Sequence, residues 1–170
     1  MGDIVGSRFE FDRGNKTKDF ELFTKQSVYT DDTVISLAVA NALILAGTDA
    51  EEKNIKDYLV SSMKHWGRKY PYAGYGVRFN NWLFSEESKP YGSYGNGCAM
   101  RVSAVGWLYD FIDRTREVAR WTAEVTHNYP EGIKGAEAVA SIIFLARNEF
   151  DKNHIKDFVI REFDYDLSRS

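Results

Sequence analysis

The sequence has a single cysteine, Cys98, among 170 residues, which excludes a disulfide within the chain and suits a reducing compartment. It has no run of basic residues, and 22 Lys and Arg face 25 Asp and Glu, so we expect no nucleic-acid interface. It also lacks an apolar stretch long enough to span a membrane, and it does not open with the basic-then-apolar pattern of a signal peptide. We therefore expect a cytoplasmic protein with no membrane partner. A small anionic ligand, which needs only local donors, remains compatible with this charge.

Alternation of apolar and polar residues with period two is also missing, which argues against strands. Helical periodicity is present instead, and a chain of this length can bury one substantial core. The sequence predicts an all-α fold in a single domain, residues 1–170. The predicted helices are residues 33–46, 48–67, 99–111, 115–124, 131–147 and 152–163, with Thr48 to Glu51 as a capping box and Leu37, Ile44 and Leu45 on the apolar face of the first.

Residues 68–97 interrupt this pattern with glycines, aromatic side chains and two prolines. Only residues 79–84 within them suggest a short helix. Loops of this length in a compact domain are usually functional or disordered. The aromatic content favours a functional loop.

The run Thr30-Asp31-Asp32-Thr33 precedes an apolar helix and has two interpretations. Carboxylates in a first helical turn are stabilised by the free N–H groups and the helix dipole, so the run can simply begin a helix. Two Asp, a Thr hydroxyl and water are also suitable ligands for Mg²⁺. From this segment alone, the capping interpretation is the stronger one.

Three further segments combine residues that could carry chemistry. Residues 2–10 place two glycines near Glu10, residues 91–101 form a glycine-rich turn before a predicted helix, and His127 lies just ahead of Pro130. Glycines let backbone amides approach a ligand, and a helix start offers N–H groups to phosphate. Each segment also has a purely structural interpretation, as a helix contact, a tight loop or a packed histidine.

Taken in order, the four segments resemble the motifs of the ADP-ribosylglycohydrolase family, and the resemblance spans essentially the whole chain. The matching residues are Gly2, Asp3, Gly6 and Glu10; Thr30, Asp31, Asp32 and Thr33; Gly92, Gly95, Asn96, Gly97, Met100 and Arg101; and Thr126, His127, Pro130 and Gly135.

This resemblance implies an all-helical fold that binds two Mg²⁺ ions at the base of an ADP-ribose cleft. By similarity, Thr30, Asp31 and Asp32 are expected to ligate metal, which reverses the preference for a helix cap. Glu10 is expected beside the ions as a ligand or proton-transfer residue. The substrate-binding residues implied are Gly92, Ser93, Tyr94, Asn96, Gly97 and His127. The implied reaction is hydrolysis of an ADP-ribosyl bond to a protein side chain or a small molecule.

The later Asp-x-Asp motif that completes the metal site in this family has no clear equivalent here. The run Asp164-Tyr165-Asp166 is followed by Leu167, and we do not assign it that role. We therefore expect a C-terminally truncated, incomplete enzyme, weak in activity unless a second polypeptide or a dimer mate supplies the later carboxylates. The alternatives are an ADP-ribose-binding module without turnover and a helical interaction fragment without a small-molecule site.

Overall fold

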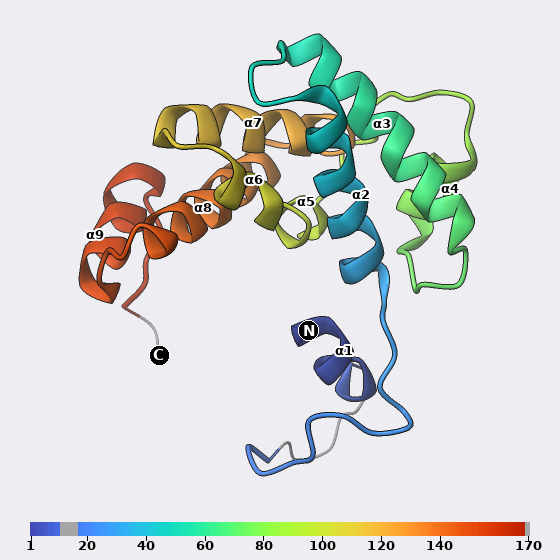
Figure 1. The fold of residues 1–170 in the computed structure, drawn as a ribbon, viewed down its shortest axis with the longest axis horizontal. Coiled ribbons are helices and arrows are strands. Elements are labelled where there is room, and N and C mark those ends of the chain that lie inside the picture. Colours follow the sequence, from blue (N-terminus) through green and yellow to red (C-terminus); the bar gives the residue numbers. More distant parts are fainter. Residues whose placement is uncertain (11–16, 169–170) are drawn as a thin grey trace.

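The computed structural model describes residues 1–10 and 17–168, and all regular structure within them is helical (Figure 1). The all-α fold class is therefore confirmed. The elements are α1 (Gly2–Gly6), the 3₁₀ turn η1 (Ser7–Phe9), α2 (Asp31–Ala46), α3 (Glu52–Lys69), α4 (Val77–Phe84), α5 (Gly97–Met100), α6 (Ser103–Leu108), α7 (Ile112–Glu124), α8 (Pro130–Arg147) and α9 (Lys152–Phe163). No helix in these two described ranges is both long and apolar enough to cross a bilayer.

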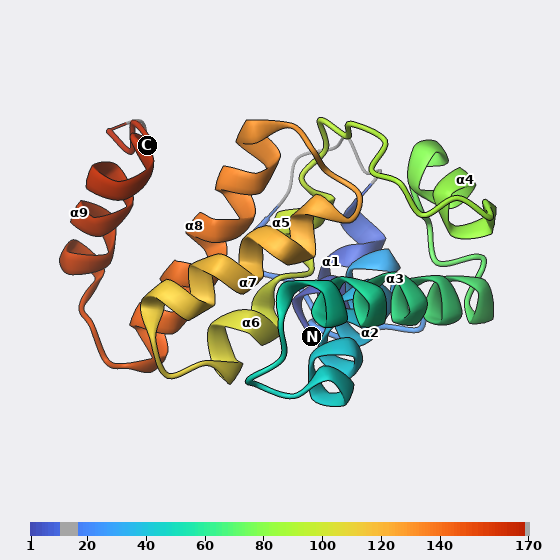
Figure 2. The same cartoon turned by 90° about the horizontal axis from the view of Figure 1, so that it is seen from above.

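Two helix pairs form the body of the molecule. Helix α2 packs along α3, and α7 packs along α8, while the short helices α5 and α6 lie between the pairs and contact members of both. Figure 2 shows the long helices from above, with α4 at one end of the molecule and α9 at the other. This arrangement leaves the first turn of α2, the start of α4 and the loop before α5 on one side of the core.

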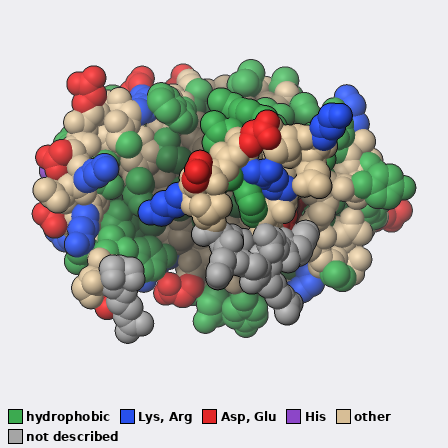
Figure 3. All heavy atoms as spheres, turned by 90° about the horizontal axis from the view of Figure 1, so that it is seen from below, with side chains coloured by type: hydrophobic (Ala, Val, Ile, Leu, Met, Phe, Trp, Pro, Cys, Tyr) green, Lys and Arg blue, Asp and Glu red, His purple; other side chains and the backbone are tan. Residues whose placement is uncertain are grey.

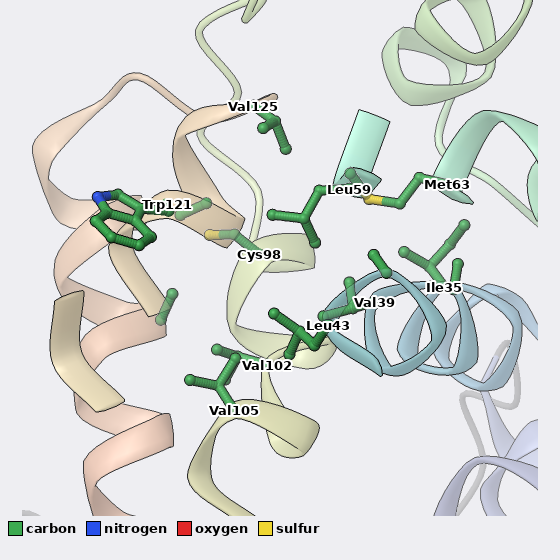
Figure 4. Packing of buried hydrophobic residues seen from close by; sticks show 14 of the residues in the cluster. Ile35, Val39, Leu43, Leu59, Met63, Cys98, Val102, Val105, Trp121 and Val125 are labelled. Atoms are coloured by element: carbon green, nitrogen blue, oxygen red, sulfur yellow. The ribbon is translucent and has the colours of Figure 1, made fainter. Parts of the chain in front are cut away.

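The core lies where α2, α3, α5 and α6 meet. Its side chains include Val39 and Leu43 from α2, Leu59 from α3 and Val105 from α6, all at most 1% exposed (Figure 4). Helix α2 is apolar around its whole circumference, and the prediction of its buried face was partly wrong. Leu37, Ile44 and Leu45 are 50%, 74% and 57% exposed, because α3 covers the opposite side of α2.

The predicted helix over residues 99–111 is interrupted. Helix α5 ends before Arg101, whose backbone (φ −95°, ψ 1°) lies outside the helical region, and α6 begins only after Val102, so that the two helices are separate. The side chain of Arg101 is buried, and one of its terminal nitrogens donates to the carbonyl of Thr122 (2.8 Å) and to Oγ1 of Thr126 (2.7 Å). We attribute the break between the two helices to these long-range hydrogen bonds, which the periodicity of apolar residues cannot predict.

The predicted capping box at Thr48 was also wrong. Helix α3 begins at Glu52, its N-cap is Glu51, and no side chain caps it. The carbonyl groups of Thr48 and Ala50 instead accept hydrogen bonds from the Arg114 guanidinium (3.3 and 2.6 Å). A long-range contact from α7 therefore organises this turn.

The surface carries both signs of charge. On the face drawn in Figure 3, Lys and Arg side chains lie interspersed with Asp and Glu and with hydrophobic side chains. This face has no extended basic patch of the kind that binds a nucleic-acid backbone.

Candidate functional site

A pocket of about 510 Å³ brings together residues that lie far apart in the sequence, from the residue after η1 to the loop before α8. It is lined by Glu10, Asp31, Asp32, Ile35, Gly76, Val77, Arg78, Phe79, Tyr91, Ser93, Gly95, Asn96, Gly97, Met100, Arg101 and His127. A second pocket, of about 590 Å³ near the α2–α3 turn, contains none of the predicted site residues. The first pocket is therefore the candidate site.

Carboxylates form one end of this pocket. Asp31 and Asp32 occupy the first turn of α2, and Glu10 follows η1. Burial, and then the charge of Asp32, raise the pKa of Asp31 to about 6. Burial, and then the charges of Asp3 and Glu10, also raise the pKa of Asp32. In the described part of the chain, none of the three pocket carboxylates forms an ion pair, so no described cation neutralises their charge by direct contact.

The helix cap at this end is supplied by Asp3, not by the Thr30 side chain. The Asp3 carboxylate accepts hydrogen bonds from the backbone N–H of Thr30 (2.8 Å) and of Thr33 (3.2 Å), and from both threonine hydroxyls (2.6 and 2.5 Å). Burial would raise the pKa of Asp3, but these hydrogen bonds outweigh it and lower the pKa. Helix α1 contacts α2, and Figure 1 shows it below the N-terminal end of that helix. Because Asp3 performs the capping, the pocket carboxylates of Asp31 and Asp32 are left to face a ligand.

These oxygen donors fit a hard divalent cation in kind, because Mg²⁺ prefers carboxylates, hydroxyls and water. Thr30 has its hydroxyl bonded to Asp3 and does not line the pocket. Over residues 1–10 and 17–168, no three His, Cys, Asp or Glu side chains gather as a metal-ligand group. The residues present therefore suit part of a metal shell, chiefly through Asp31 and Asp32.

His127 also lines the pocket. It is 2% exposed, its Nδ1 lies 2.7 Å from Oγ1 of Thr126, and its Nε2 is buried without a hydrogen-bond partner in the described structure. Burial, and then the positive charge of Arg101, lower the pKa of His127 to about 4, which the backbone of Gly95 opposes in part. A buried polar atom without a partner carries a free-energy cost, which a ligand atom in this pocket could remove.

The glycine-rich loop also lines the pocket. Its backbone is held at Tyr91, whose N–H donates to the carbonyl of Thr126 (3.1 Å), and at Gly95, whose N–H donates to Oγ of Ser93 (3.2 Å). Gly92 has φ +61°, a conformation that residues with a Cβ rarely adopt. A Cβ at Gly97 would lie 3.8 Å from the His127 ring, which is ordinary contact.

The structure brings most of the predicted site residues together, but not all. The pocket contains Glu10, Asp31, Asp32, Ser93, Asn96, Gly97 and His127. Thr30, Gly92 and Tyr94 do not line it. Tyr94 is 76% exposed and packs against Tyr129, with ring centroids 4.5 Å apart. Its predicted contact with substrate would require this aromatic pair to move.

Sequence reasoning did not identify several other lining residues. Arg78 and Phe79 come from α4, which lies in the sequence between the segment 30–33 and the glycine-rich segment 91–101. Only the tertiary fold places them in the pocket. Arg101 belonged to the quoted motif but had no assigned role. No local pattern marked Arg78, because a single Arg in a helical turn is usually a solvated side chain.

The shifted pKa of His127 gives a first prediction. Its unfolded-state pKa is about 6.5, so between pH 6.5 and 4 the unfolded chain binds a proton that the folded chain does not. The free energy of unfolding should therefore decrease as the pH falls through this interval, and be fully retained above it. Urea denaturation at several pH values measures this.

The variant His127→Gln serves as the control, because it should lose this part of the pH dependence. Titration of the imidazole resonances by NMR provides a direct check, with His127 assigned by its disappearance in the variant. A His127 resonance titrating near pH 6.5 in the folded protein would contradict the prediction.

Comparison with known proteins identifies a family. The family model described as ADP-ribosylglycohydrolase matches residues 1–166. The chain is 32% identical over 133 residues to ADP-ribosylhydrolase ARH3 of Gallus gallus, covering 69% of this chain and 35% of that protein. It is 30% identical over 161 residues to the Xenopus tropicalis protein of the same name (80% and 44%), and 30% identical over 138 residues to the Homo sapiens protein (72% and 36%).

The aligned part of this chain thus spans less than half the length of these curated relatives. The family match, in contrast, covers nearly all of the chain and includes every segment that lines the pocket. The order of the motifs, the all-helical fold and the match over residues 1–166 lead to one conclusion: this chain belongs to the ADP-ribosylglycohydrolase family.

Proposed function

We propose that this chain contributes Glu10, Asp31 and Asp32, together with the glycine-rich loop and His127, to the active site of an Mg²⁺-dependent ADP-ribosylglycohydrolase. The substrate is an ADP-ribosylated protein side chain or a small molecule with the same linkage. The observation that supports this most directly is the pocket, in which Glu10, Asp31 and Asp32 face the glycine-rich loop and His127. The names of the curated relatives, all ADP-ribosylhydrolases, support the same reaction class.

The reaction adds one water across the glycosidic bond. The bond between C1″ of the ribose and the acceptor atom breaks, the water oxygen joins C1″, and the acceptor leaves with a proton. Such bonds break through an oxocarbenium-like state, which positioned carboxylates stabilise. Bound Mg²⁺ would supply orientation of ribose hydroxyls and a more acidic water. Asp31 and Asp32 would hold the cation in this scheme.

Glu10 is the residue proposed to handle the proton of the attacking water. It is exposed at the pocket, it forms no ion pair with a described residue, and it lies close enough to Asp31 and Asp32 to raise both of their pKa values. The loop residues Ser93, Asn96 and Gly97 would hold the diphosphate and ribose. Their contribution is position, which accelerates a reaction without direct bond chemistry.

The second candidate function is an ADP-ribose-binding module without turnover. The incomplete set of metal-ligating side chains in the described structure favours it to some degree. The carboxylates clustered in the pocket argue against it, because recognition of an anionic ligand gains nothing from uncompensated negative charge.

A paired measurement separates the two functions. Isothermal titration calorimetry of ADP-ribose with and without chelator measures binding, and release of ADP-ribose from an ADP-ribosylated peptide measures hydrolysis. Metal-dependent release supports the hydrolase. Tight ADP-ribose binding that chelator leaves unchanged, without release at high protein concentration, would support the binding module and contradict the hydrolase proposal.

Metal binding by the isolated chain is expected to be weak. Cation affinity rises with the number and charge of the ligands, and the described residues supply chiefly Asp31 and Asp32. We expect Mg²⁺ titration by calorimetry to show dissociation constants in the millimolar range, on the order of 10⁻³ M. Addition of a polypeptide that supplies further carboxylates, or self-association into a dimer, should tighten it. Tight binding of two ions by the monomeric chain would contradict this expectation.

A further inference from the structure

The candidate pocket is lined by charges of both signs. Glu10, Asp31 and Asp32 contribute negative charge, whereas the wall formed by α4, the loop and the C-terminal end of α5 carries Arg78 and Arg101. Neither arginine forms an ion pair with a carboxylate in the part of the chain that the structure describes. This wall is therefore cationic and uncompensated.

Arg101 contributes charge from below the surface. It is 1% exposed, and its hydrogen bonds go to the backbone of Thr122 and the hydroxyl of Thr126, while its Nε has no partner in the described structure. A buried cation without a counter-ion is costly. An anion in the pocket would reduce this free-energy cost, because it would be attracted electrostatically to Arg101 without direct contact.

Arg78 differs because its guanidinium is exposed at the pocket. One of its terminal nitrogens donates to the carbonyl of Tyr91, the other lies 3.5 Å from the carbonyl of Gly92, and its Cζ is 5.4 Å from the centre of the Tyr91 ring. These contacts fix the guanidinium at the first residues of the glycine-rich loop. A guanidinium has five N–H donors, so several remain for a ligand.

The start of α4 provides further donors beside Arg78. Gly76 is the N-cap of this helix without a side-chain cap, and Gly76, Val77 and Arg78 all line the pocket. The first N–H groups of a helix have no partner within the helix and attract anions. His127, which is 2% exposed, lines the same pocket, and its Nε2 has no hydrogen-bond partner in the described structure, which independently indicates a ligand there.

We propose that Arg78 binds the diphosphate of the ligand directly, beside the first residues of the glycine-rich loop, and that it sets the preference of the site for a diphosphate over an uncharged or singly phosphorylated ligand. Arg is suited to this role because its planar fork bonds two phosphate oxygens at once. The identification of the anion as a diphosphate rests on the function proposed above. The anion site itself rests on the geometry of Arg78 and α4.

The test compares two probes, inorganic pyrophosphate and ADP-ribose, by calorimetry on the full chain. Arg78→Gln should weaken the binding of both by about 10- to 100-fold, the range expected for losing a hydrogen bond to a charged group. Arg78→Lys keeps the charge but loses the fork, so it should fall between the wild type and the glutamine variant.

Arg68→Gln is the matched control. Arg68 also donates to backbone carbonyls, those of Leu83 (2.7 Å) and Ser85 (3.5 Å), but it does not line the pocket. Its replacement should leave both affinities within about twofold. The NMR resonance of His127 reports on the loop, so an unchanged resonance in Arg78→Gln shows that lost binding is not caused by a displaced loop.

The possible results separate this inference from the proposed function. Loss of pyrophosphate and ADP-ribose binding in Arg78→Gln supports both. Loss of pyrophosphate binding in a chain that does not bind ADP-ribose supports the anion site and contradicts the proposed function. Wild-type ADP-ribose affinity in Arg78→Gln, a wild-type chain that does not bind pyrophosphate, or a His127 resonance displaced in Arg78→Gln would each overturn the role of Arg78.

Discussion

Replacing Glu10 by glutamine should lower the rate of ADP-ribose release by about 100- to 10,000-fold, the range typical for removing a general acid or base, or to the uncatalysed background where that is higher. Glutamine has nearly the same shape but cannot accept the proton of the attacking water. Glu10 lies at the pocket beside Asp31 and Asp32, and it forms no ion pair in the described structure whose loss could disturb the fold. The rate should therefore fall while stability is kept.

The measurement is release of labelled ADP-ribose from a modified peptide, with the chain in excess and Mg²⁺ present, so that a single slow turnover can be counted. Binding of ADP-ribose to Glu10→Gln should stay within about threefold of the wild type, because an interaction made only in the transition state affects the rate and not the affinity. Glu86→Gln is the control, since Glu86 is exposed and outside the pocket. Unchanged release by Glu10→Gln would show that another group moves the proton.

The variant Gly106→Ala should lower the free energy of unfolding by about 1–3 kcal/mol, the usual cost of overpacking. Gly106 is buried in α6 against α8. A Cβ there would lie 2.7 Å from the backbone carbonyl oxygen of Ala140 and 2.7 Å from both Cβ and Cγ2 of Ile143. The higher helix propensity of Ala would offset about 1 kcal/mol. A net loss is still expected, because the backbone of α8 cannot give way without moving the helix.

Gly67→Ala provides the comparison, measured by the same urea denaturation. A Cβ at Gly67 would approach Leu83 Cδ1 and Cδ2 to 2.6 Å, as close as the contacts at Gly106, but these atoms are the end of a side chain that can change rotamer. The loss should therefore be smaller than for Gly106→Ala. Equal losses would mean that α8 shifts as readily as a leucine side chain, which would contradict the argument.

The helices that could be predicted best are those whose ends carry local signals. The predicted boundaries of α9, residues 152–163, match the structure, where Asp151 caps it by accepting hydrogen bonds from the N–H groups of Asn153 and His154. Helix α8 was predicted within one residue, and Pro130 occupies its first turn. These signals act within a few residues along the chain, so they can be recognised without the fold.

The helix ends that could not be predicted depend on distant partners. The separation of α5 from α6 coincides with the anchoring of Arg101 on Thr122 of α7 and on Thr126, which follows that helix. The start of α2 is capped by Asp3, which lies 27 residues before Thr30. Neither partner can be found from the local sequence. The same limitation applies to the exposed face of α2, since an all-round apolar helix gives no periodic signal for which side α3 covers.

The sequence by itself determined the all-helical class, the family, and the carboxylates, glycines and histidine of the site, because residue identity and motif order are properties of the chain. Only the tertiary structure decided which of these residues meet. It placed Asp31, Asp32 and Glu10 in one pocket with His127, left Tyr94 on the outside, and added Arg78 beside the start of the loop. The physical reason is that electrostatic interactions and hydrogen bonds depend on distance in space. Only the folded backbone brings groups that are far apart in the sequence within a few ångströms of one another.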